Sequence, residues 1–242
     1  KYFNICCDET FDLGKGRNRD TGTDVLYSEF LKKIMNIVTA HGKIPMFWGD
    51  VISHNPEIVR ELPENTVVLE WDYSAECNWY DTARMQQAGA LFYVCPGCNG
   101  WNTFLNDINT ASANITNYAR KGLRFGATGL LNTDWGDYGH VNLPSASLHG
   151  LALGAAAGWN VEKAADLNSF DRAFELLELG AENCGLCAVW REIMNRKPLP
   201  WGTLQLEFDP GEKNLIPEKN HAFPPLPELK ELARRFIAIC AG

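Results

Sequence analysis

The chain has 242 residues, of which 45% are hydrophobic and 21% are charged, and its formal net charge is −8. This composition is typical of a globular protein and argues against a disordered or fibrous chain. The negative charge argues against binding to nucleic acid or to an anionic membrane, because both would need a basic stripe. No apolar run reaches the length of a membrane span, so we expect no membrane partner.

The chain opens with an apolar run, Tyr2–Cys7, which ends in the two carboxylates Asp8 and Glu9. The run predicts a strand buried on both faces of a parallel sheet. Catalytic groups of α/β enzymes are found at the C-terminal tips of such strands. The acids are therefore candidate catalytic residues. The alternative is that Asp8 caps a loop and Glu9 is simply solvated.

Strands and helices alternate through the following 150 residues. After a glycine-rich loop, an amphipathic helix capped by Thr23 or Asp24 ends at about residue 40. Its predicted buried face consists of Leu26, Phe30, Ile34, Ile37 and Val38. Further strands are predicted over 43–50, 66–72, 90–95 and 126–131, and further helices over 56–62, 81–88, 108–123 and 145–159.

Strand, tip loop and helix, repeated about five times, predict a parallel α/β architecture. A doubly wound sheet and a (β/α)8 barrel both fit this order. Aromatic and acidic residues recur at every strand tip, and only in a barrel do all tips meet at one mouth. We therefore predict a (β/α)8 barrel of the TIM type, of which residues 1–160 supply the C-terminal five or so β/α units.

Residues 161–242 predict an α-helical C-terminal extension to the barrel. Helices are expected over 166–179, 182–195 and 226–241, with no strand between the first two. The stretch 197–227 is rich in proline, and we expect it to be extended and packed along the surface.

Eight cysteines include two C-x-x-C pairs, Cys95 with Cys98 and Cys184 with Cys187. A zinc site or a redox pair is conceivable from this spacing. The long interval between the pairs favours free cysteines that serve as small apolar residues. Free cysteines are consistent with a reducing compartment, which slightly favours a cytoplasmic location.

Acids and aromatic side chains at the strand tips predict a carbohydrate site. Aromatic faces can stack on a sugar ring, and carboxylates accept hydrogen bonds from its hydroxyls. Metalloprotease, α/β-hydrolase and Walker motifs are missing from the sequence. Each tryptophan could instead be a core residue, and a register shift of one would turn Tyr93 to the other face. The candidate residues are Asp8, Glu9, Trp48, Trp71, Tyr93, Trp135 and Asp137.

These motifs resemble those of the β-N-acetylhexosaminidases of glycoside hydrolase family 20. Cys6 stands where that family usually has glycine, and we expect the strand to tolerate it. The opening strand resembles the fourth of the family's barrel, so an N-terminal half-barrel is expected as the missing partner of residues 1–160. The motifs that carry the resemblance are Asn4–Thr10 with Asp12–Gly14, Phe47–Asp50, Pro96-Gly97 with Asn99–Asn102, and Thr133–His140.

The resemblance implies removal of terminal β-linked N-acetylglucosamine or N-acetylgalactosamine from glycans, without metal or organic cofactor. The acetamido oxygen of the substrate attacks the anomeric carbon, giving an oxazolinium intermediate and net retention. Glu9 would protonate the leaving oxygen and then activate water, and an apolar pocket would raise its pKa. Asp8 would stay ionised, orient the acetamido N–H and stabilise the developing positive charge.

The same resemblance implies roles for the remaining candidates. Trp48, Trp71 and Trp135 would wall the pocket, Tyr93 would bond the acetamido carbonyl, and Asp137 would hold outer hydroxyls of the sugar. Adjacent side chains of a regular strand face opposite ways, so we expect the backbone to leave β geometry at the acid pair.

Two other functions stay open. An incomplete or degenerate barrel could act as a carbohydrate-binding module without catalysis. A barrel glycosidase with carboxylates on separate strands would use Asp137 or Asp50 as its second catalytic group, and it would cleave substrates that lack an acetamido group.

Overall fold

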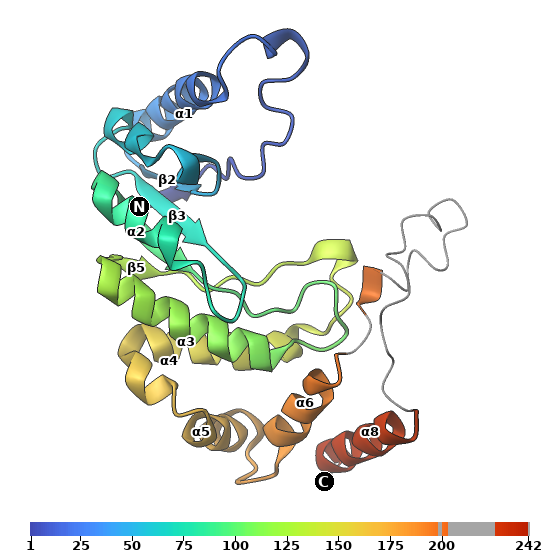
Figure 1. Cartoon of the computed structure of the whole chain (residues 1–242). Helices are drawn as coiled ribbons and strands as arrows, with labels where there is room; N and C mark the ends of the chain where they lie inside the picture. Colours follow the sequence, from blue (N-terminus) through green and yellow to red (C-terminus); the bar gives the residue numbers. More distant parts are fainter. Residues whose placement is uncertain (198–199, 203–225, 242) are drawn as a thin grey trace. The chain divides into compact units, whose positions relative to one another are not determined.

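The structure, a computed structural model, describes residues 1–197, 200–202 and 226–241. Contacts divide the chain into two compact units (Figure 1). The first unit is Lys1–Pro96 with Asn117–Leu131, and the second is Gly97–Thr116 with Asn132–Gly242. The boundary predicted after residue 160 falls within helix α4 (Leu148–Ala164), next to a kink at Asn160, and it stays a prediction.

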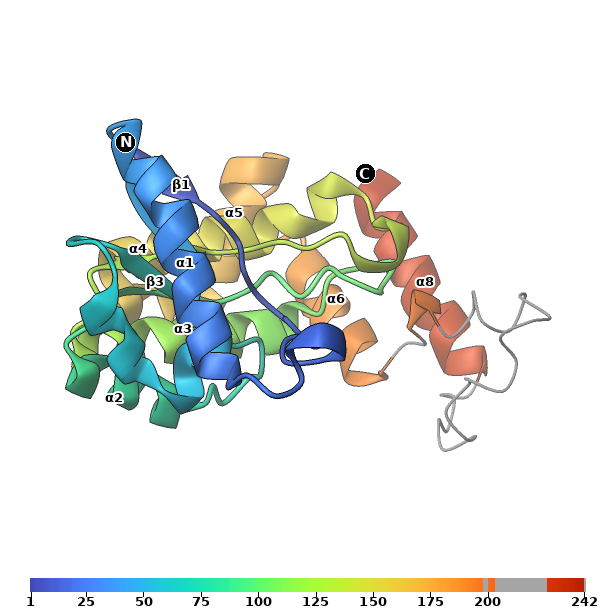
Figure 2. The same cartoon turned by 90° about the horizontal axis from the view of Figure 1, so that it is seen from above.

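The first unit contains a parallel five-stranded sheet in the order β1-β2-β3-β4-β5. The sheet is curled like half of a barrel, with helices along its outer face (Figures 1 and 2). Each strand pairs with its neighbour in the sequence, so these five strands contain no switch point. The predicted parallel α/β architecture is thereby confirmed. The strands are β1 (Tyr2–Asn4), β2 (Ile44–Trp48), β3 (Val67–Trp71), β4 (Leu91–Cys95) and β5 (Gly129–Leu130).

One core joins the outer face of the sheet to its helices. Phe47, Val68 and Phe92 occupy paired positions on β2, β3 and β4, and all three are buried in this core. Their helical partners include Leu31 of α1 and Met85 of α2. The helices of this layer are α1 (Thr23–Ala40), α2 (Trp79–Ala88) and the second half of α3 (Ile108–Phe125).

The buried face of α1 differs from the prediction. Tyr27, Leu31 and Met35 are buried, whereas Phe30 and Ile37 are exposed. Apolar residues lie on more than one side of this helix, so periodicity alone allows two faces. Tertiary contacts decide which side packs on the sheet. Of the predicted face, Val38 is buried and Leu26 and Ile34 are half-buried, so the prediction is wrong for Phe30 and Ile37.

The first strand also differs from the prediction. β1 contains only Tyr2–Asn4 and lies at the edge of the sheet, paired with β2 alone. Tyr2 is 44% exposed and Phe3 is 55% exposed. The prediction of a strand over Tyr2–Cys7 that is buried on both faces is thus wrong, because an apolar run does not distinguish an edge strand from a central one.

The other predicted elements are found within a few residues of their expected bounds. The predicted helix over 56–62 is a 3₁₀ segment, η3 (Pro56–Glu61). In the second unit α4, α5 (Leu167–Leu179), α6 (Leu186–Asn195) and α8 (Leu226–Ala241) pack in chain order (Figure 1). Most of the stretch 197–227, predicted to be extended, lies outside the described residues.

None of the helices in the described ranges combines the length and the apolar character that crossing a membrane requires.

A buried carboxylate lies within the core of the first unit. Glu70 of β3 is 6% exposed and accepts hydrogen bonds from the hydroxyls of Thr82, at 3.0 Å, and Tyr118. Burial raises the pKa of Glu70 from 4.5 to about 7, although the bonds from Tyr118 and Thr82 oppose the shift. Below about pH 7 the protonated form is therefore favoured in the folded state.

This shift predicts how stability depends on pH. Between pH 4.5 and pH 7 the unfolded chain ionises Glu70 while the folded chain keeps it protonated. The free energy of unfolding should therefore fall as pH rises through this window, by up to roughly 3 kcal/mol relative to Glu70→Gln, which cannot ionise. Denaturant unfolding at pH 4.5 and pH 8 measures the difference. The exposed control Glu64→Gln should follow the wild type, and identical pH profiles for wild type and Glu70→Gln would contradict the prediction.

Candidate functional site

The backbone leaves β geometry just before the acid pair. Cys6, Cys7 and Glu9 all have positive φ, at 60°, 68° and 50°. These left-handed values are uncommon for residues other than glycine. They break the strict alternation of a strand, so the side chains of Asp8 and Glu9 are not forced to opposite faces of the sheet. The departure expected at the acids is present, and it begins earlier in the chain than predicted.

Hydrogen bonds to neighbouring elements hold this turn. The hydroxyl of Tyr27, on α1, donates to the carbonyl oxygen of Cys7 at 2.6 Å. The Oδ2 atom of Asp50, just after β2, accepts the backbone N–H of Glu9 at 2.9 Å. The second oxygen of Asp50, Oδ1, is buried without a hydrogen-bond partner among the described residues. The turn is thus fixed from both α1 and the end of β2.

Glu9 borders a cavity of about 320 Å³ in the first unit. The cavity lies between the loop that follows the acids, the first turn of α1 and the segment after β2. Glu9 itself is exposed, and Asp8 is half-buried. The first unit therefore does not enclose Glu9 in an apolar pocket. The cavity is lined by Glu9, Thr10, Phe11, Leu13, Thr23, Asp24, Tyr27, Asp50, Val51, His54 and Ile58.

Three predicted aromatic residues share the concave face of the sheet. Leu69 pairs with both Trp48 and Tyr93, so these side chains form one row across β2, β3 and β4. Trp71 lies two residues beyond Leu69 and so faces the same way. Phe47, next to Trp48, packs in the helical core on the opposite face. The register therefore turns all three aromatic residues away from the helices.

The three aromatic residues differ in accessibility. Trp48 is only 5% exposed, whereas Trp71 is half-buried and stacks on Tyr73 with ring centroids 5.1 Å apart. The ring of Tyr93 covers Gly129 of β5, where a Cβ atom would lie 2.7 Å from the ring. Trp71 is thus the more accessible of the two indoles on this face.

Tyr93 is already engaged by another tyrosine. Burial and a side-chain hydrogen bond with Tyr2 of β1 raise the pKa of Tyr93. The bond joins strands that are not neighbours in the sheet, as the curl of the half-barrel allows. A substrate carbonyl would have to replace Tyr2 as the partner of this hydroxyl.

Trp135 and Asp137 belong to the second unit. Trp135 is half-buried, and the exposed Asp137 begins the short 3₁₀ segment η4 (Asp137–Gly139).

The loop Gly97–Asp107 lies in the same unit and is held by the buried side chain of Asn106. The Nδ2 atom of Asn106 donates to the Cys98 carbonyl and to the Ser147 hydroxyl, both at 3.1 Å. A polar network thus shapes the loop of this unit that carries Asn99–Asn102.

The structure brings some predicted residues together and leaves others apart. Asp8 and Glu9 are consecutive on one strained turn, and Trp48, Trp71 and Tyr93 share one face of the sheet. None of these three aromatic residues lines the cavity beside Glu9.

From the sequence, Asp50 was considered only as an alternative second catalytic group, whereas in the structure it holds the backbone of Glu9. The available signal was its place directly after the second strand. Asp72, which directly follows β3, has a local role instead: it accepts hydrogen bonds from the N–H groups of Ser74 and Asn78 and caps the loop. Acids that follow neighbouring strands thus serve different purposes.

Comparison of the sequence with models of known protein families and with curated proteins finds no match. The function proposed below therefore depends on the residues, their geometry and the resemblance described above.

The left-handed turn predicts an effect of glycine at Cys6. The exposed Cys6 has φ of 60°, and its N–H is held by the side chain of Asn4 at 2.9 Å. A left-handed backbone costs an L-residue roughly 1–2 kcal/mol, more than the roughly 0.5–1 kcal/mol that glycine loses in chain entropy. Cys6→Gly should therefore be more stable than the control Cys6→Ala by about 0.5 kcal/mol or more in denaturant unfolding. A less stable glycine variant would show that the backbone at Cys6 is not left-handed.

Proposed function

We propose that this chain carries the catalytic acids of a β-N-acetylhexosaminidase that removes terminal β-linked N-acetylhexosamine by retaining, substrate-assisted hydrolysis. The observation that carries the proposal is the strained turn over Cys6–Glu9, which places two adjacent acids just beyond the first strand of a parallel sheet. Backbone strain of this kind is frequent at functional sites, where the surrounding structure maintains it. Here Tyr27 and Asp50 maintain it.

Two adjacent acids suit a mechanism in which the substrate supplies the nucleophile. Mechanisms with two independent carboxylates place them on opposite sides of the sugar, several ångströms apart. Two neighbouring residues cannot easily reach opposite sides of the sugar. In a substrate-assisted mechanism one acid donates the proton and the other orients the acetamido N–H, so both acids lie on one side. Glu9 then protonates the leaving oxygen and activates water, while Asp8 holds the acetamido group and stabilises the positive charge.

The concave face of the sheet supplies walls for a sugar ring. Trp71 presents a half-buried indole, and Trp48 and Tyr93 lie in the neighbouring row. In this proposal Tyr93 exchanges its bond with Tyr2 for one to the acetamido carbonyl. The roles that the resemblance implies for Trp135 and Asp137 of the second unit, a pocket wall and a partner of outer hydroxyls, stay predictions.

The proposal includes a barrel of the TIM type that is larger than the described sheet. The edge strand β1 and the exposed Tyr2 and Phe3 support it, because a further strand pairing with β1 would cover them. A larger barrel would also enclose the exposed Glu9 and give it the water-poor surroundings that a general acid needs.

A carbohydrate-binding function without catalysis is the second candidate, and the exposure of Glu9 favours it. A general acid needs a dry surrounding to keep its proton near neutral pH, and the described residues do not provide one. Sugar binding needs only the aromatic faces and hydrogen-bonding groups. Asp50 is less suited as a separate second catalytic carboxylate, because one of its oxygens holds the backbone of Glu9.

The catalytic role of Glu9 is tested with aryl N-acetyl-β-glucosaminides and the natural protein. Glu9→Gln should lower kcat/KM for the 4-methylumbelliferyl substrate by at least about a hundredfold, because general acid catalysis is lost. The loss should be smaller for a 2,4-dinitrophenyl substrate, whose leaving group needs little protonation.

The control is Asp12→Asn, an exposed acid on the same loop, which should keep wild-type turnover. Undiminished turnover in Glu9→Gln would remove Glu9 from the mechanism. A wild-type protein that binds a thiazoline analogue of the oxazolinium intermediate and hydrolyses nothing would favour the binding function.

A further inference from the structure

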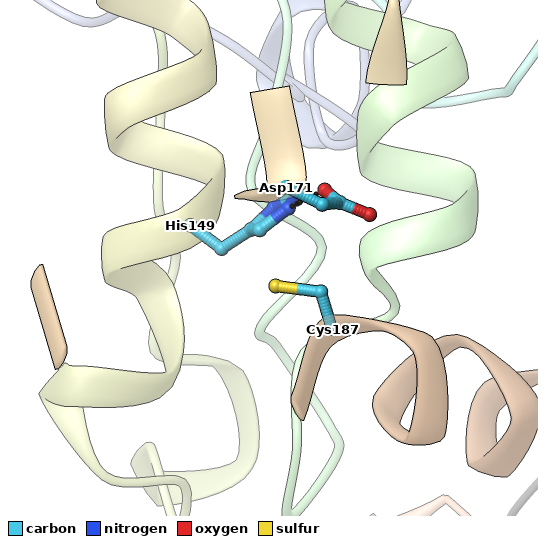
Figure 3. Close-up of side chains that lie close together, drawn as sticks. All are labelled: His149, Asp171 and Cys187. Atoms are coloured by element: carbon cyan, nitrogen blue, oxygen red, sulfur yellow. Dashed lines mark hydrogen bonds and ion pairs between the residues drawn. The ribbon is translucent and has the colours of Figure 1, made fainter. Parts of the chain in front are cut away.

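Three potential metal ligands meet in the interior of the second unit. His149 of α4, Asp171 of α5 and Cys187 of α6 each place one ligand atom within 4.8 Å of the other two (Figure 3). His149 and Cys187 are fully buried, and the side chain of Asp171 is 15% exposed. The cluster is separate from the residues assigned to the glycosidase, so it has no role in the proposed hydrolysis.

The imidazole of His149 has an unused nitrogen. Its Nε2 atom lies 2.8 Å from Oδ1 of Asp171, and a carboxylate can only accept, so Nε2 carries the proton in the neutral ring. The lone pair then lies on Nδ1, which is buried without a hydrogen-bond partner among the described residues. The rings of Phe170 and Phe174 make T-shaped contacts with the imidazole, with ring centroids 5.3 and 5.1 Å away. A buried lone pair without a donor is unfavourable, so the hydrogen bonds of the described residues leave this ring partly unsatisfied.

Asp171 is held in place by an arginine on α6. The Nε atom of Arg191 lies 2.7 Å from Oδ2 of Asp171, and Nη2 lies 2.9 Å from Oδ1. Arg191 also donates to the Ile108 carbonyl of α3 at 3.2 Å. Burial would raise the pKa of Asp171, but the bonds from His149 and Arg191 lower it overall, so the carboxylate is ionised.

The charge around the cluster is unbalanced when His149 is neutral. Glu175 is buried beside it and accepts the backbone N–H groups of Gly185 and Cys187 at 3.2 and 2.9 Å. The buried carboxylate of Glu175 and the partly buried carboxylate of Asp171 thus lie near one guanidinium, that of Arg191. A divalent cation bound together with the deprotonated thiolate of Cys187 would bring the group to neutrality.

We propose that His149, Asp171 and Cys187 bind one divalent transition-metal ion of the Zn²⁺ type, which ties α4, α5 and α6 together. The donor set is one nitrogen, one oxygen and one sulfur, a combination that Zn²⁺ accepts and that Mg²⁺ and Ca²⁺ do not favour. The nitrogen beside Asp171 is Nε2, so Nε2 would bind the ion in place of its hydrogen bond to Asp171, with the ring proton carried on Nδ1. Arg191 stays on the outer side of Asp171 and orients it.

Cys187 is the residue whose chemistry changes on metal binding. Cysteine binds metal ions as the thiolate, whereas a free cysteine thiol is mostly protonated at neutral pH. A coordinating cation displaces that proton. Metal binding should therefore release a proton from Cys187, and calorimetric titrations in two buffers of different ionisation enthalpy would detect it.

The test is a titration of the reduced, chelator-treated natural protein with Zn²⁺, Co²⁺ and Mg²⁺. We expect one Zn²⁺ per chain, a rise of several degrees in Tm, and a near-ultraviolet thiolate-to-cobalt charge-transfer band with Co²⁺. Mg²⁺ should have no effect. Cys187→Ser should abolish the band and weaken Zn²⁺ binding by at least about a hundredfold, since the loss of an outer partner alone costs 10–100-fold.

Cys240→Ser, which removes an exposed cysteine of the same unit, is the matched control and should bind as the wild type does. The wild-type cobalt spectrum keeps the test decisive if Cys187→Ser does not fold. The proposal is overturned if the wild type binds no stoichiometric Zn²⁺, if its cobalt complex lacks the thiolate band, or if folded Cys187→Ser binds Zn²⁺ as tightly as the wild type.

Discussion

The parallel register of β2, β3 and β4 is the constraint on which the first unit depends. Side chains alternate along a strand, so the pairing of Phe47 with Val68 commits Trp48 to the concave face of the sheet. A slip of one residue would move the indole into the helical core and turn Phe47 outward. The helices fix this choice, because α1 and α2 pack only against the apolar outer face. The aromatic surface is therefore a by-product of how the core is built.

The turn at Asp8 and Glu9 differs from the sheet in what stabilises it. Its backbone conformation is locally strained, and tertiary hydrogen bonds maintain it. Cys6, Cys7 and Glu9 adopt backbone angles that their residue types disfavour. Hydrogen bonds from Tyr27 and to Asp50 come from elements far away in the sequence. The turn that carries Asp8 and Glu9 is thus held by α1 and by the segment after β2. Asp8 and Glu9 themselves are not part of the core that α1 and β2 help to form.

The sequence allowed most of the sheet to be predicted, because apolar runs bounded by glycine and proline mark β2, β3 and β4 well. It did not reveal which side of α1 is buried, since Phe30 and Tyr27 both have apolar neighbours at helical spacing. The φ angle of Cys6 was hidden for a different reason: no local pattern distinguishes a left-handed cysteine from a strand residue. The cluster around His149 joins three helices, and such long-range proximity leaves no periodic signal.

The central claim is that the acetamido group of the substrate takes part in the reaction, and comparison of substrates with and without it is the most direct test. The natural polypeptide should hydrolyse an aryl N-acetyl-β-glucosaminide, release the β-anomer first as seen by proton NMR, and slow markedly when the acetamido group is replaced by trifluoroacetamido. It should not act on the matching β-glucoside. Similar rates on the glucoside, or initial release of the α-anomer, would contradict the account.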